Sequence, residues 1–120
     1  MSDQDPDIWS GIEDLWAWLD SHSPGDGQQN LLLRMLKLSE EVGEVAEAVI
    51  GAMNRNPRKG ASHTWEDVES ELCDVVITAL IALRTLTPDT REVFVRHLAR
   101  VRERSLGPGP GPRPADPRPA

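Results

Sequence analysis

The sequence has 120 residues and one cysteine, so it is long enough for one modest domain and cannot form an internal disulfide framework. Its formal net charge of −7 argues against nucleic-acid binding through a broad basic patch, because phosphate backbones attract surplus positive charge. No run of about 18 apolar residues and no basic-then-apolar leader occurs, so we expect a cytoplasmic protein with no membrane partner.

Apolar residues at helical spacing predict an all-α fold, a helical bundle of about four helices with no strand. The first predicted helix covers about 7–21, and the Ser/Pro/Gly-rich segment 23–27 ends it. The second covers about 28–53. Its apolar stripe predicts one buried face, made of Leu31, Met35, Leu38, Val42, Val45, Val49 and Met53.

Thr64 is the predicted N-cap of a third helix at about 65–85. This helix is apolar nearly all round from Leu72 onward, so it should be central in the bundle or shared with a second subunit. A core this small often gains stability from a partner subunit, and we expect a homodimer or homotetramer.

Thr87 and Pro88 predict the N-cap and first position of a fourth helix at about 88–104. Its expected buried side consists of Val93, Phe94, Leu98 and Val101. The predicted organisation along the chain is a flexible N-terminus at 1–6, a helical domain at 7–105 and a disordered Pro/Gly-rich tail at 106–120.

Two pairs of carboxylates, Glu41 with Glu44 and Glu71 with Asp74, have i, i+3 spacing on the second and third predicted helices. Residues three apart share a helix face, so packing of the two helices would bring four acidic groups together. Such a cluster is costly to bury unless a cation neutralises it, and oxygen ligands suit Mg²⁺ or Mn²⁺. No histidine follows a glutamate by three residues, which disfavours a di-iron site.

Each half of this cluster also has a plainer interpretation. The acidic run at 40–47 could be a solvated helix face. Asp74 could lie at the solvent edge, or could pair with an arginine such as Arg34 or Arg84. Cys73 has no suitably placed basic partner in the sequence and is expected in the core.

The two half-motifs, Glu40-Glu41-x-x-Glu44 and Glu71-x-x-Asp74, resemble the signature of the MazG-like all-α nucleoside triphosphate pyrophosphohydrolases. The resemblance covers roughly residues 28–86. It implies Mg²⁺-dependent hydrolysis of a nucleoside triphosphate to the monophosphate and pyrophosphate, and it implies that both carboxylate pairs are metal ligands. Glu40 would lie next to the metals and could hold or deprotonate the attacking water, although Glu44 or a purely metal-bound hydroxide could serve equally.

A triphosphate substrate also requires positive side chains near its phosphates. Three of them lie in the loop between the two motif helices, and two more precede Glu41 by one or two turns. They are Arg55, Arg58 and Lys59, then Arg34 and Lys37. Trp18 lies off the apolar stripe of its helix and could stack on a base, and Asn30 could read a base edge or act as a cap. Each of these residues could instead be a surface charge or a packing residue.

The expected function is therefore a magnesium-dependent nucleoside triphosphate pyrophosphohydrolase that clears non-standard or surplus nucleotides. A related pyrophosphatase specific for dUTP, dCTP or phosphoribosyl-ATP is the nearest alternative. From a different class, the chain could be a non-catalytic helical interaction module whose proline-rich tail binds a partner domain.

Overall fold

The computed structural model describes residues 7–54, 58, 62–107 and 114–119. The regular elements in this part of the chain are four helices and no strand, which confirms the predicted all-α class. It divides into two compact units, Met1–Thr90 and Arg91–Ala120. The predicted flexible segment at 1–6 and most of the Pro/Gly-rich repeat lie outside the described residues.

The first unit contains three long helices, α1 (Ile8–His22), α2 (Gly27–Ala52) and α3 (Trp65–Leu86). A polar side chain caps the start of each one. The Asp7 carboxylate accepts the N–H of Ser10 before α1, and Asp26 with Gln29 forms a capping box before α2. Thr64 caps α3 as predicted, and its hydroxyl accepts the N–H of Asp67. These caps satisfy N–H groups that have no partner within their own helix.

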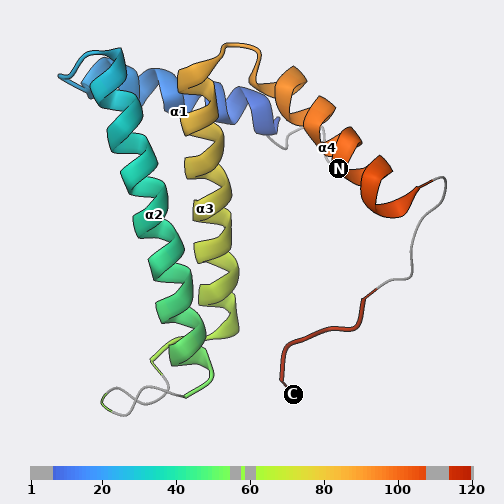
Figure 1. The fold of residues 1–120 in the computed structure, drawn as a ribbon. Coiled ribbons are helices and arrows are strands. Elements are labelled where there is room, and N and C mark those ends of the chain that lie inside the picture. Colours follow the sequence, from blue (N-terminus) through green and yellow to red (C-terminus); the bar gives the residue numbers. More distant parts are fainter. Residues whose placement is uncertain (1–6, 55–57, 59–61, 108–113, 120) are drawn as a thin grey trace. The chain divides into compact units, whose positions relative to one another are not determined.

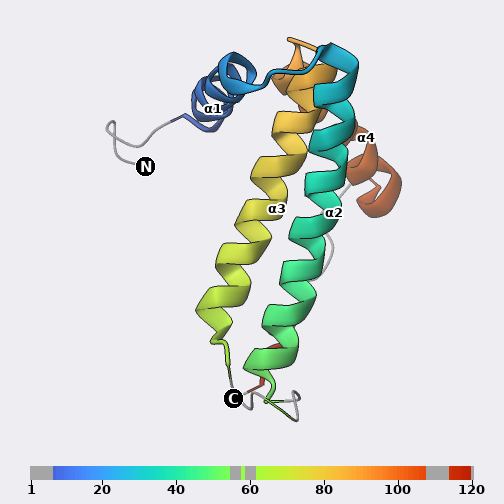
Figure 2. The same ribbon diagram turned by 90° about the vertical axis from the view of Figure 1, so that its left-hand side faces the viewer.

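Helices α2 and α3 run antiparallel, side by side, and form a long hairpin (Figures 1 and 2). Helix α1 lies across the end of this hairpin where α2 begins and α3 ends. Ile12 of α1 is buried there against Leu80 and Ile81 of α3. Three partly buried side chains of α1 pack around this cluster: Trp9, Trp16 and Leu19.

Polar contacts also join α1 to α3. The Trp16 indole N–H donates to the Thr85 hydroxyl at 3.2 Å. The Arg84 guanidinium donates to both carboxylate oxygens of Glu13, at 2.6 and 3.0 Å, and lies 3.7 Å from the centre of the Trp16 ring. The bidentate pair and the ring contact fix Arg84 in one orientation.

The hairpin leaves much apolar surface exposed. The predicted buried stripe of α2 is wrong at three positions, since Met35, Val42 and Met53 are 41–52% exposed. On α3, side chains that were expected to be central are also exposed, among them Leu72, Val76 and Cys73. Two helices in contact can bury only one side of each, so the apolar residues on the other sides stay open in the single chain.

The second unit holds most of α4 (Thr90–Leu106). This helix begins two residues later than predicted, although the Thr87 hydroxyl does accept the N–H of Asp89 as a capping residue would. Gly107, at φ +63°, ends it, because a residue without a Cβ adopts this left-handed conformation easily. The predicted buried side of α4 is wrong for Val93, Phe94 and Leu98, which are exposed.

No helix in the described ranges is both long and apolar enough to cross a bilayer.

Candidate metal centre

Three carboxylates from the two helices of the hairpin meet at one place. Glu41 and Glu44 lie on the same face of α2, and Glu71 comes from the facing side of α3. One oxygen of each lies within 4.8 Å of an oxygen of the other two. This spacing allows all three to bind one cation, and the convergence of both half-motifs on one spot is the central expectation from the sequence.

Two carboxylate oxygens of this cluster are buried and have no hydrogen-bond partner within the described residues. Glu41 is nine-tenths buried, and Oε2 of Glu41 and Oε2 of Glu71 have no hydrogen-bond partner within the described part of the chain. The negative charge of Glu41, followed by burial and the charge of Glu71, raises the pKa of Glu44 above its ordinary value. A buried acceptor without a donor is costly, so these groups fit a site that is completed by a cation.

Lys37 supplies the positive charge nearest to the cluster. Its Nζ lies 3.3 Å from Oε1 of Glu41 and 3.7 Å from Oε2 of Glu40. The hydrogen bond to Glu41 and the charges of the surrounding glutamates raise the pKa of Lys37. Its side chain remains 53% exposed, so it can turn from the carboxylates toward a phosphate group.

Glu40 and Asp74 lie outside the three-carboxylate group. The side chain of Glu40 is 63% exposed beside Lys37. Asp74 lies on α3 three residues beyond Glu71, and it is exposed. Neither of the arginines considered as its partner bonds to it, because Arg34 donates to Thr85 and Arg84 pairs with Glu13.

The other predicted substrate-binding residues are less well placed, or their placement is not described. Arg55 and Lys59 lie outside the described residues, and Arg58 between them is exposed. Trp18 is 58% exposed and its ring contacts His22 of the same helix, with ring centres 4.8 Å apart.

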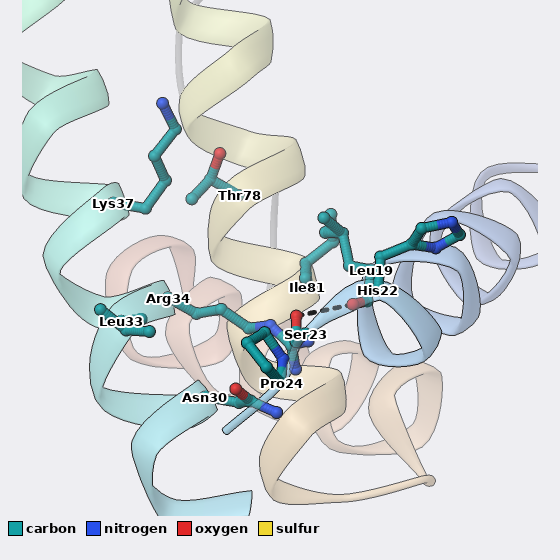
Figure 3. Close-up of a pocket in the computed structure, with 10 residues that line it drawn as sticks. All are labelled: Leu19, His22, Ser23, Pro24, Asn30, Leu33, Arg34, Lys37, Thr78 and Ile81. Atoms are coloured by element: carbon teal, nitrogen blue, oxygen red, sulfur yellow. Dashed lines mark hydrogen bonds between the residues drawn. The ribbon is translucent and has the colours of Figure 1, made fainter. Parts of the chain in front are cut away.

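The first unit has a pocket of about 380 Å³, and one of its lining residues is Lys37, which pairs with Glu41 (Figure 3). All three helices of the first unit and the α1–α2 connection form its walls. Its other lining residues are Leu19, His22, Ser23, Pro24, Asn30, Leu33, Arg34, Thr78 and Ile81. Sequence reasoning considered Asn30 and Arg34 separately. Their spacing with Lys37 and Glu41, at positions 30, 34, 37 and 41, is the signal that places them on one helix face.

Comparison of the chain with protein-family models, with curated proteins and with solved structures found no match. What the protein does must therefore be inferred from its own residues, above all from the converging carboxylates and from the pocket that Lys37 lines.

Proposed function

We propose that this protein is a Mg²⁺-dependent nucleoside triphosphate pyrophosphohydrolase, similar to the MazG-like enzymes that its two half-motifs resemble. The observation that carries the proposal is the meeting of Glu41, Glu44 and Glu71, with two buried oxygens that have no donor within the described residues. A solvated acidic face would not bury carboxylate oxygens in this way. A cation-binding site accounts for both the convergence and the burial.

The donor set suits magnesium. Carboxylate oxygens are the ligands that Mg²⁺ and Mn²⁺ prefer, and both cations keep room for substrate phosphates. Glu41, Glu44 and Glu71 would hold the cation. The cation, when bound, neutralises charge on the triphosphate and acidifies water.

Lys37 and Glu40 would contribute to substrate binding and to catalysis. Lys37 adjoins the carboxylates and would bind a phosphate oxygen of the substrate. Glu40, next in sequence to Glu41 and exposed, would orient the attacking water and accept its proton. Water cleaves the bond between the α- and β-phosphates, and the nucleoside monophosphate and pyrophosphate leave. A specialised pyrophosphatase for dUTP, dCTP or phosphoribosyl-ATP would use the same carboxylates.

A second copy of the chain would complete the fold. Large apolar side chains on the hairpin are exposed in the single chain, including Leu32, Leu33 and Leu36 at 57–67%. Exposed apolar patches of this kind mark association surfaces in soluble proteins. We propose a homodimer or homotetramer in which these side chains are covered.

The test is a panel of nucleoside triphosphates, assayed for pyrophosphate release with and without Mg²⁺. We expect release from at least one triphosphate only when the cation is present. Glu41→Gln should reduce the rate by at least about a hundredfold, because it removes a buried ligand. Glu47→Gln, an exposed glutamate later on α2, is the matched control and should keep the activity.

Release that does not depend on a divalent cation would contradict the proposal, as would full activity of Glu41→Gln. If no triphosphate in the panel releases pyrophosphate, the result would favour the non-catalytic interaction module.

A further inference from the structure

Lys37 brings a mobile positive charge to a buried carboxylate. Its Nζ lies 3.3 Å from Oε1 of Glu41 and 3.7 Å from Oε2 of Glu40. Glu41 is about nine-tenths buried, whereas the Lys37 side chain is 53% exposed. The ammonium therefore serves as the counter-ion of Glu41 without being buried itself.

This ammonium neutralises only part of the carboxylate cluster. The three carboxylates carry up to three negative charges within 4.8 Å of one another, and Lys37 supplies one positive charge. The Oε2 atoms of Glu41 and Glu71 still have no hydrogen-bond donor within the described residues. A divalent cation held by all three carboxylates would neutralise more of this charge than the ammonium does.

A divalent cation and the Lys37 ammonium would compete for Glu41 even if they contact different oxygens. The negative charge of Glu41 holds the ammonium, and a cation bound to the same carboxylate cancels that charge. The cation also repels the ammonium directly. Three carboxylates would hold the divalent cation, whereas Lys37 depends on Glu41 and on the exposed Glu40, so Lys37 is the group that leaves.

The Lys37 side chain is able to move away. Its four-carbon stem is flexible, and an exposed ion pair holds such a stem only weakly. Lys37 also lines the pocket of the first unit, and Figure 3 shows its ammonium pointing away from the pocket residues Arg34 and Asn30. Release from Glu41 would leave the ammonium free to turn toward an anion that arrives with the cation.

We propose that Lys37 is a stand-in for the metal: its ammonium pairs with Glu41 when no divalent cation is bound, and a bound cation displaces it. This inference rests on the proposed metal site and adds a regulation of that site. The exchange couples cation binding to phosphate binding, because the ammonium becomes available to a phosphate oxygen once the cation has replaced it on Glu41. It also means that Lys37 lowers the affinity of the site for a cation alone.

The experiment measures the affinity of the full-length protein for Mn²⁺ without substrate, by electron paramagnetic resonance of the free ion. We expect Lys37→Met to bind Mn²⁺ about three- to tenfold more tightly than the wild type, because a half-exposed competing charge is removed. Lys37→Arg keeps the charge and should stay within about twofold of the wild type. Arg96→Met removes one positive charge from an exposed position on α4; this matched control should bind Mn²⁺ as the wild type does.

A second measurement uses the wild type and does not depend on the folding of Lys37→Met. The sequence has two lysines, Lys37 and Lys59, so an NMR spectrum of the lysine ammonium groups is simple, and Lys37→Arg assigns it. We expect Mg²⁺ to increase the mobility of the Lys37 ammonium, because the ammonium loses its carboxylate partner. In Glu41→Gln, the Lys37 ammonium should already be mobile without Mg²⁺.

Unchanged Mn²⁺ binding by folded Lys37→Met would overturn the proposal. Weaker binding would also overturn it, and would show instead that Lys37 orients Glu41 as a metal ligand. A Lys37 ammonium that becomes no more mobile when Mg²⁺ binds to the wild type would contradict the exchange as well. None of these three results affects metal-dependent pyrophosphate release.

The failure of the hydrolase proposal has a different signature. Tighter Mn²⁺ binding by Lys37→Met, together with a triphosphate panel that releases no pyrophosphate, would reject the hydrolase and keep the exchange. A wild-type protein that binds no Mn²⁺ would overturn both the metal site and the role of Lys37.

Discussion

Replacing Glu41 by glutamine should change the stability of the protein in opposite directions, depending on whether a divalent cation is present. Glu41 and Glu71 have oxygens at most 4.8 Å apart. At an effective dielectric constant of 20, two unit charges at this separation repel by about 3.5 kcal/mol. Glu41→Gln removes that repulsion and also the ion pair with half-exposed Lys37, which solvent screens and which is therefore the weaker of the two interactions. Without metal, the variant should therefore be the more stable protein.

When Mg²⁺ is added, the wild type should become more stable than Glu41→Gln. A ligand at a hundred times its dissociation constant stabilises the folded state by about 2.7 kcal/mol. For a domain of this size, each kcal/mol raises the melting temperature by roughly 4–8 °C. Glu41→Gln, which lacks a ligand, should show little of this rise. Thermal unfolding followed by circular dichroism, with and without Mg²⁺, measures both effects.

The exposed Glu47→Gln variant serves again as the control and should respond to Mg²⁺ as the wild type does. Two results together would refute the reasoning: Glu41→Gln is less stable than the wild type without metal, and it gains as much stability from Mg²⁺ as the wild type does.

Two further predictions concern the scaffold. The pKa of Glu13 lies below its ordinary value of 4.5, because Arg84 donates hydrogen bonds to its carboxylate. The Glu13–Arg84 pair therefore stabilises the fold fully above pH 4.5. This stabilisation is lost as the pH falls through the lowered pKa. Urea unfolding should give a Glu13→Gln deficit below about 1 kcal/mol at pH 7 that vanishes in acid; a deficit that persists there would contradict this. Gly51→Ala should destabilise the folded protein by about 1–3 kcal/mol, because the added Cβ would collide with side chains just before α3. Gly43 has open space around it, so Gly43→Ala should stabilise the folded protein by up to about 1 kcal/mol. Equal melting temperatures for the two alanine variants would contradict the close approach at Gly51.

Local sequence signals predicted the helices well. Thr64 was the predicted cap of α3, and Asp7 and Asp26, which were not predicted as caps, likewise supply a side-chain oxygen just before a helix; a cap of this kind depends only on residues within one turn. Four carboxylates were predicted to meet, and three of them, Glu41, Glu44 and Glu71, do so, since i, i+3 spacing fixes a helix face and the two helices pack together.

Packing was harder to predict, because periodicity identifies an apolar face without showing what covers it. Met35 and Val42 share a stripe with Leu38, yet α3 covers only part of that stripe. Arg34 was equally ambiguous in sequence, since an arginine near acidic residues resembles a surface ion pair. Its burial depends on Thr85, which is 51 residues away and reaches it only in the folded chain.

The central claim is that side chains of α2 and α3 together bind a divalent cation. The most direct measurement is anomalous diffraction at the manganese edge, from crystals of the protein grown with Mn²⁺. We expect an anomalous peak within about 2.5 Å of oxygens from Glu41, Glu44 and Glu71. Crystals with saturating Mn²⁺ and no peak among these three carboxylates would contradict the account.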